Sequence, residues 1–146
     1  MNDTPQRFSD FMGVEASFQD YVDIRYAPAA DGSPQMLVDI DTRHINMGKV
    51  LHGGMVMTLL DVAMATMCRH HDALRRGAVT VELKVNFLRP CGKAGERVIA
   101  TGRLRHATTH LAFCDGELRD SADMLLATAS GTFKYVTRGK PQRGDS

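Results

Sequence analysis

Residues 54–71 read GMVMTLLDVAMATMCRHH, the most apolar stretch of this 146-residue chain. Apolar side chains fall on nearly every side of a helix here, a pattern typical of a helix buried all round. The run is broken by Thr58, Asp61 and Thr66 and is too short to cross a bilayer. We therefore predict one long helix in the centre of the fold, with a carboxylate inside it.

Strand-like segments lie on both sides of this helix in the sequence. The clearest covers residues 79–87, where apolar and polar side chains alternate in strict period two. In that alternation Thr80 shares a face with Glu82 and Lys84, away from the apolar row. The remaining strands are predicted at residues 21–26, 35–41, 96–105, 110–118 and 125–136.

The order of these elements predicts the fold class. The four strands after the helix are joined by connections too short for crossover helices, so the sheet should be mainly antiparallel. One helix cannot cover both faces of a sheet of that size. We therefore predict an α+β fold in which a mainly antiparallel sheet wraps around one long central helix. A single domain is assigned to residues 1–136, with an N-terminal helix or arm at 1–13 and a disordered tail at 137–146.

Charge and cysteine content argue against several classes of function. The formal net charge of +1 provides no strong field for nucleic acid or an anionic membrane. Cys68, Cys91 and Cys114 lie far apart without C-x-x-C spacing, which argues against a zinc site and suits a reducing compartment. The N-terminus lacks the apolar core of a signal peptide. The sequence predicts a cytoplasmic protein with no nucleic-acid, membrane or metal partner.

The candidate catalytic residues lie between Asn46 and Asp61. A carboxylate among apolar neighbours is costly, so Asp61 either caps a nearby loop or serves as a base, and the second reading is favoured. Gly53 and Gly54 lie where the helix begins, and its first N–H groups could stabilise a developing oxyanion; a tight turn is the alternative. His52 is expected mainly to orient the loop, and Asn46 could donate to a substrate carbonyl or cap a turn.

The sequence spacing places the Gly53 N–H and the Asp61 carboxylate far apart on the predicted helix. Gly53 precedes Asp61 by eight positions, which is about 12 Å along a helix axis. One ester carbon cannot touch both groups on a single helix. A productive site would need Gly53 from one subunit and Asp61 from another, across a symmetric interface, and the monomer should be inactive.

This segment resembles a motif of the hotdog-fold thioesterases of the phenylacetate-degradation type, N-x-x-G-x-x-H-G-G with an Asp nine residues after the His. Residues 80–90, TVELKVNFLRP, resemble a second block of that family, and the similarity extends over residues 35–136. One position departs from the motif, because Lys49 stands three residues before His52 and Gly48 lies one place earlier. The resemblance implies a hotdog fold, a homodimer or homotetramer, and hydrolysis of acyl-coenzyme A.

The same resemblance implies roles for individual residues. Asp61 would be the base or the nucleophile, and the Gly53 N–H would polarise the thioester carbonyl with help from Asn46. Thr80 falls where family members carry a Ser or Thr that positions the attacking water. Asp61 and Thr80 would face Asn46 and Gly53 of the other subunit. No metal or separate cofactor is required, since coenzyme A is part of the substrate.

Coenzyme A carries phosphates, which a nearly neutral protein must bind through a local basic patch. The candidate substrate-binding residues are Gly54, Arg75, Arg76, Arg89 and Lys93. Ordinary solvated surface charge is the alternative for each of the four basic residues.

Two other functions remain open at this point. A hydratase or dehydratase on the same fold would rely on a catalytic His, and His52 keeps that possibility, although Asp61 inside the helix favours hydrolysis. A non-catalytic acyl-CoA-binding module should lack the Asp, which this chain retains. The sequence leaves open the acyl group, an acyl carrier protein as donor, and whether Asp61 acts as base or nucleophile.

Overall fold

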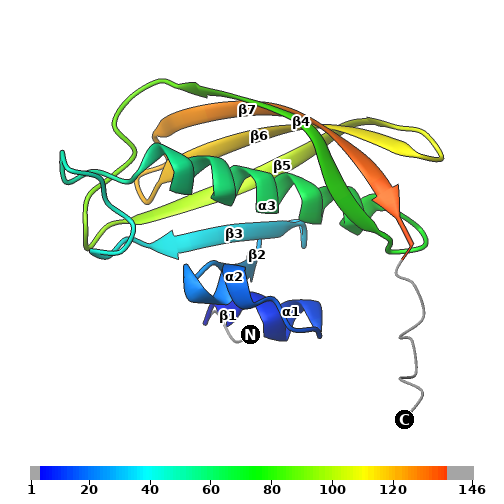
Figure 1. Cartoon of the computed structure of the whole chain (residues 1–146), viewed down its shortest axis with the longest axis horizontal. Coiled ribbons are helices and arrows are strands. Elements are labelled where there is room, and N and C mark those ends of the chain that lie inside the picture. The colour runs from blue at the N-terminus through cyan, green and yellow to red at the C-terminus, as the bar shows by residue number, and fades with distance from the viewer. Residues whose placement is uncertain (1–3, 138–146) are drawn as a thin grey trace, which may run out of the picture.

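The computed structural model describes residues 4–137 and shows a single sheet packed against one long helix. Seven strands take the order β1-β2-β3-β5-β6-β7-β4, and every neighbouring pair is antiparallel. The helix α3 (Gly53–His71) runs along one face of this sheet (Figure 1). The predicted architecture, a mainly antiparallel sheet around one long helix, is confirmed.

Before α3 the structure has more helices and strands, and shorter ones, than the sequence predicted. Before α3 come β1 (Gln6–Arg7), α1 (Phe8–Met12), α2 (Ser17–Tyr21), β2 (Arg25–Pro28) and β3 (Pro34–Asp39). After it come β4 (Gly77–Phe87), β5 (Arg97–Ala107), β6 (Leu111–Asp120) and β7 (Leu125–Val136). The predicted tail, apart from Thr137, lies outside the described residues. Among residues 4–137, no helix is long and apolar enough to span a membrane.

The core lies between α3 and the inner face of the sheet. Ten of the nineteen residues of α3 are buried, so the helix is covered along most of its length. Its fully buried side chains meet those of the strands, and the largest in α3 and in the strands are Leu59, Leu60, Met64, Met36, Leu118 and Phe133. The three cysteines are free and buried. The helix is therefore central, as predicted, but it is not buried all round, since Met57 is 39% exposed and Asp61 is only half-buried.

The close approach of β5 to α3 depends on a glycine. A Cβ atom placed on Gly102 would lie 2.9 Å from the Cβ of Met67 and 3.2 Å from both the Ala63 carbonyl oxygen and the Met64 Cα. These are helix atoms that cannot move aside without shifting α3 itself. Gly102 therefore sets how closely the sheet packs on the helix.

The strand predicted at residues 21–26 is wrong in its first half. Ser17–Tyr21 forms α2, and the strand β2 begins only at Arg25. The alternation of apolar and polar side chains in residues 21–26 crosses the C-terminal end of α2. There Asp23 takes a left-handed conformation with φ of 57°. The Ile24 N–H then donates to the Gln19 carbonyl at 2.9 Å, which closes the turn. Alternation over so few residues did not distinguish a helical turn from a strand.

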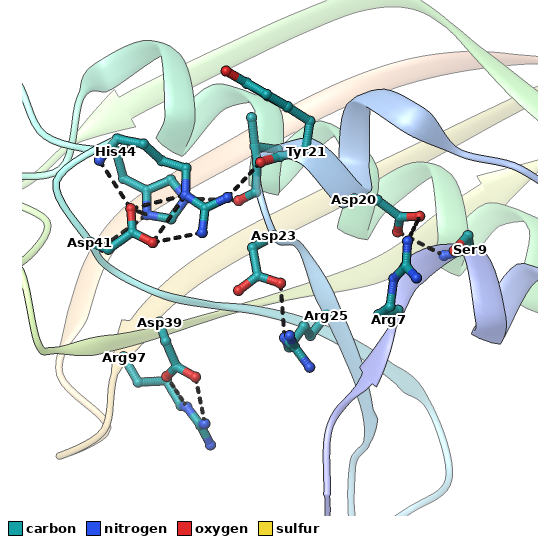
Figure 2. Close-up of polar contacts among 12 residues, drawn as sticks. Arg7, Ser9, Asp20, Tyr21, Asp23, Arg25, Asp39, Asp41, His44 and Arg97 are labelled. Atoms are coloured by element: carbon teal, nitrogen blue, oxygen red, sulfur yellow. Dashed lines mark hydrogen bonds and ion pairs between the residues drawn. The ribbon is translucent and has the colours of Figure 1, made fainter.

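Polar contacts hold this N-terminal segment to the rest of the fold (Figure 2). The Asp20 carboxylate accepts hydrogen bonds from Arg7 Nη2 at 2.9 Å and from the Ser9 N–H at 3.2 Å, which joins α2 to β1 and α1. The buried His44 ring lies 2.7 Å from the Val22 carbonyl through Nε2, which donates because Nδ1 accepts the Asp41 N–H. Both contacts thus hold the segment at the C-terminal end of α2.

Strand β4 contains a bulge that changes which way its side chains point. Thr80 pairs with the buried Phe133, whereas Glu82 pairs with Thr132 on the opposite face, and the register shifts between them. The prediction that Thr80 shares a face with Glu82 and Lys84 is therefore wrong. A single extra residue, Val81, reverses the alternation and turns Thr80 towards α3.

The packing at Gly102 can be tested by adding one methyl group. Gly102→Ala should lower the free energy of unfolding by about 1–3 kcal/mol, because the new Cβ would overlap helix atoms. Gly77→Ala in β4 is the matched control, since its Cβ would meet Val136 at an ordinary 3.5 Å. Chemical denaturation of both variants measures the difference. Equal stability of the two would show that α3 can move away from β5 without cost.

Candidate active site

Asp61 and Thr80 form the polar centre of the candidate site. The Thr80 hydroxyl donates to Asp61 Oδ1 at 2.5 Å, so β4 and α3 meet through this bond. Asp61 is half-buried rather than enclosed, and its carboxylate has a hydrogen-bond donor. The carboxylate that the sequence places inside the apolar helix is thus less buried than expected. An accessible carboxylate next to a hydroxyl can hold and deprotonate a water molecule.

A cavity of about 330 Å³ opens beside this pair. Asp61 and Thr80 lie in its wall, together with further residues of α3 and β4. The opposite wall comes from the N-terminal segment, with Phe8, Met12, Val14, Glu15, Ala16 and Gln19. The cavity therefore lies between the central helix and the α1–α2 segment, with the carboxylate at its side.

The start of α3 carries the second candidate group. His52 is the N-cap, and its Nδ1 accepts the Gly54 N–H at 2.9 Å. The Gly53 N–H has no partner among residues 4–137. Gly53 therefore offers a free donor at the positive end of the helix dipole, while the Gly54 N–H is already used. The His52 side chain therefore caps the start of α3.

The loop before α3 is a tight turn closed on Asn46. The Asn46 N–H donates to the Val50 carbonyl at 2.9 Å, and Asn46 Oδ1 accepts the Val50 N–H at 3.3 Å. Lys49 takes a left-handed conformation with φ of 64°. Lys49 thus occupies, with a side chain, the backbone region that glycine adopts most readily. Asn46 uses its side-chain oxygen in the turn, which leaves its amide NH₂ to donate elsewhere.

A second cavity of about 390 Å³ lies at this end of the helix. Asn46, Gly53, Phe87 and Arg89 are in its wall. It shares no lining residue with the cavity beside Asp61. Each chain therefore carries two separate partial sites, one with the carboxylate and one with the helix N-terminus.

The four basic candidates do not gather in one patch of a single chain. Arg89 and Lys93 lie in the connection that contacts the loop before α3, since the Leu51 N–H donates to the Gly92 carbonyl at 2.8 Å. Arg75 and Arg76 follow the other end of α3. Because α3 has nineteen residues, these pairs are separated by about the length of the helix, roughly 27 Å.

Arg76 has a structural role in addition to its charge. It donates to both carboxylate oxygens of Asp72 at 3.0 Å and lies over the Tyr135 ring at 4.5 Å. These hydrogen bonds lower the pKa of the Asp72 carboxyl to about 2. Arg76 therefore ties the end of α3 to β7, whereas Arg89 Nη1 donates to the Met124 sulfur at 3.0 Å.

Comparison with known proteins assigns the family. Residues 48–127 match the family model described as the thioesterase superfamily. This chain belongs to the thioesterase superfamily. One relative is the medium/long-chain acyl-CoA thioesterase YigI of Escherichia coli, which is 35% identical over 97 residues. That match covers 58% of this chain and 61% of YigI.

Two solved structures share the fold of this chain. The BH2602 protein of Bacillus halodurans, solved with CoA, gives a TM-score of 0.79 at 22% identity, over 90% of this chain and 85% of that one. The PaaI protein from the phenylacetic acid degradation operon of Escherichia coli gives 0.76 at 23% identity, over 88% and 90%. The predicted hotdog fold is confirmed.

Sequence reasoning missed one wall of this thioesterase-superfamily site. Residues 8–13 were predicted only as part of an N-terminal helix or arm and residues 14–19 were given no role, yet six residues of this segment line the cavity beside Asp61. The apolar side chains Phe8, Met12 and Val14 were the available signal. A segment this short cannot bury them by itself, so they must pack against another part of the protein. Phe87, whose ring would lie 3.6 Å from a Cβ on Gly53, was also treated only as a strand residue.

The cap on α3 can be tested at His52. His52→Ala should lower the free energy of unfolding by about 1 kcal/mol, because the Gly54 N–H loses its acceptor. His52→Asn should lower it less, since an Asn side chain also accepts at an N-cap. Urea denaturation of the two variants against the wild type measures both values. If the two variants lose the same stability, the cap hydrogen bond contributes nothing.

Proposed function

We propose that this protein hydrolyses acyl-coenzyme A thioesters to the free acid and coenzyme A, at a site shared by two subunits. The observation that carries the proposal is the Asp61–Thr80 hydrogen bond of 2.5 Å in one cavity, with a free Gly53 N–H in another. The first pair can activate water, and the second group can stabilise an oxyanion. Membership of the thioesterase superfamily and the likeness to YigI support coenzyme A as the thiol.

The reaction follows from the chemistry of these groups. The Thr80 hydroxyl donates a hydrogen bond to Asp61. Its oxygen can therefore accept a hydrogen bond from the attacking water and fix the position of that water. Asp61 takes a proton from this water as the water oxygen bonds to the thioester carbon. The carbonyl oxygen gains negative charge and is stabilised by the Gly53 N–H, with the Asn46 amide as a second donor. Collapse then breaks the C–S bond, and the departing thiolate receives the proton held by Asp61.

The exposed edge of β4 supports a shared site. This strand is at the end of the sheet, and Val79, Val81 and Phe87 are 53%, 62% and 50% exposed. A long apolar edge strand is a template for pairing with another chain. Antiparallel pairing of two β4 strands would place the two α3 helices side by side in opposite directions. The start of one helix would then approach the middle of the other, where Asp61 lies.

The alternative functions receive less support from the site. A hydratase would need the His52 ring as its base, but Nδ1 accepts the Gly54 N–H at 2.9 Å and so holds the ring in the cap. A binding module has no need for a carboxylate with an adjacent hydroxyl. We therefore favour hydrolysis by water that Asp61 activates, in the cytoplasm.

Thiol release from acetyl-, hexanoyl- and phenylacetyl-CoA tests the proposed activity. The wild type should release thiol, and Asp61→Asn should lower kcat by at least about 100-fold, because the general base is lost. Thr80→Ser keeps the hydroxyl and should stay near the wild type, whereas Thr80→Val should lose most of the rate. Release of thiol by Asp61→Asn at the wild-type rate would remove the carboxylate from the mechanism. Tight binding of every thioester without release would support the binding module.

The shared site is tested with two variants that each damage one half. Gly53→Pro removes the N–H while preserving the helix, since proline is favoured at this first position and His52 already has φ of −60° and ψ of 136°. Gly53→Ala keeps the N–H and is the matched control. Gly53→Pro and Asp61→Asn homodimers should both be inactive.

A purified heterodimer of these two variants distinguishes the arrangements. One of its two sites would combine Gly53 from the Asp61→Asn chain with Asp61 from the Gly53→Pro chain. Its rate should therefore recover to about half that of the wild-type dimer. A heterodimer as inactive as its parents would mean that both groups act from the same chain.

A further inference from the structure

We propose that residues 8–19 form a selectivity wall that admits uncharged, apolar acyl groups of moderate size. The wall comprises α1, the start of α2 and the loop between them. This inference rests on the proposed thioester hydrolysis and specifies the acyl group that it accepts.

The wall lies outside the part of the chain that matches the family model. Six of the fourteen residues that line the cavity beside Asp61 come from residues 8–19. The family model covers only residues 48–127. The matched part therefore supplies Asp61 and Thr80, and a separate segment supplies the surface opposite them. A change in this segment can alter the acyl pocket without touching the catalytic groups.

The wall is fixed in place rather than loosely attached. Phe8 is 6% exposed and belongs to the core, and the Phe11 ring stacks on Tyr26 with centroids 3.7 Å apart. The Asp20 carboxylate joins Arg7 to the Ser9 N–H, as Figure 2 shows. A wall held by packing and by hydrogen bonds gives a preformed pocket, so its shape discriminates between acyl groups.

The lining of the cavity defines the chemistry of its occupant. Phe8, Met12, Val14 and Ala16 present apolar surface opposite α3. The volume of about 330 Å³ is near the lower end of small-molecule pockets, which run from about 300 to 1,000 Å³. The pocket therefore suits a compact acyl body, such as a six-carbon chain or a phenylacetyl group, rather than a long fatty chain.

The charges in the cavity disfavour an acyl group that ends in a carboxylate. Asp61 and Glu15 both line it, so the cavity wall carries two acidic side chains. The arginine in the lining, Arg69, donates to the backbone carbonyl of Arg75. A carboxylate at the end of the acyl group would meet these two acidic side chains, and one N–H of the nearby guanidinium is already directed to a backbone carbonyl.

The wild type is first compared on matched thioesters. Hexanoyl-CoA and adipoyl-CoA have the same number of acyl carbons but differ in the terminal carboxylate. We expect kcat/KM for hexanoyl-CoA to exceed that for adipoyl-CoA and for palmitoyl-CoA by at least about tenfold. Phenylacetyl-CoA in the same panel distinguishes an aryl from an alkyl preference. Equal kcat/KM for hexanoyl-CoA and adipoyl-CoA would overturn the charge argument.

Two substitutions in the wall then test its role. Ala16→Leu narrows the cavity and should lower kcat/KM for the preferred thioester at least about tenfold, with acetyl-CoA changed less than about threefold. Met12→Ala widens the cavity and should move the preference towards decanoyl-CoA. Ala30→Leu makes the same change as the first variant at an exposed turn and should alter nothing. Thermal unfolding checks that each variant remains folded.

The outcomes separate this inference from the proposed function. If the wild type cleaves thioesters but neither variant changes the order of preference, the wall is not selective. If no thioester is cleaved, the proposed hydrolysis fails, and binding is measured with ketone analogues in which a methylene separates sulfur from carbonyl. Weaker binding of the hexanoyl analogue to Ala16→Leu, with the acetyl analogue unchanged, would still support the wall. Equal weakening of both analogues would overturn it.

Discussion

Helix α3 holds Gly53 and Asp61 apart because it is continuous from Gly53 to His71 and buried along most of its length. A buried helix cannot bend to bring its first residue next to its ninth without breaking the packing on β5, where Gly102 leaves no space to spare. The catalytic geometry is therefore dictated by the core. If the oxyanion donor and the carboxylate serve one substrate, a second copy must supply one of them, and β4 offers the edge through which it could join.

The bulge at Val81 links the register of the sheet to the chemistry of the site. Without it, Thr80 would point away from α3 with Glu82, and Asp61 would lose its hydrogen-bond donor. A bulge removes hydrogen bonds between the two strands and increases their local twist, and such features often lie beside active sites. The compensation here is a hydroxyl that meets the carboxylate from the opposite element. β4 thus contributes both the hydroxyl that meets Asp61 and the edge proposed for pairing.

Much of this fold could be predicted from the sequence, and the failures have physical causes. The long helix and the strands after it could be predicted because their pattern of apolar side chains extends over many residues and reflects which side chains are buried. α2 was missed because the few residues around Tyr21 alternate between apolar and polar side chains in a way that fits either one helical turn or a short strand. The bulge was invisible because an extra residue changes the faces of a strand without changing its composition. Asp61 and Gly53 could be placed from neighbouring residues and spacing, whereas the partners of Arg76 depend on contacts with Asp72 and Tyr135.

The N-terminal segment illustrates how one catalytic core can serve different substrates. The core must keep α3, Thr80 and Gly53 in fixed positions, since small displacements remove the contacts that the reaction needs. Residues 8–19 face no such constraint, because they touch the acyl cavity from the side opposite the carboxylate. They need only remain attached, which Phe8 and the Asp20 contacts ensure. On the proposed function, a substitution in α1 or α2 would therefore change selectivity while Asp61, Thr80 and Gly53 stay unchanged.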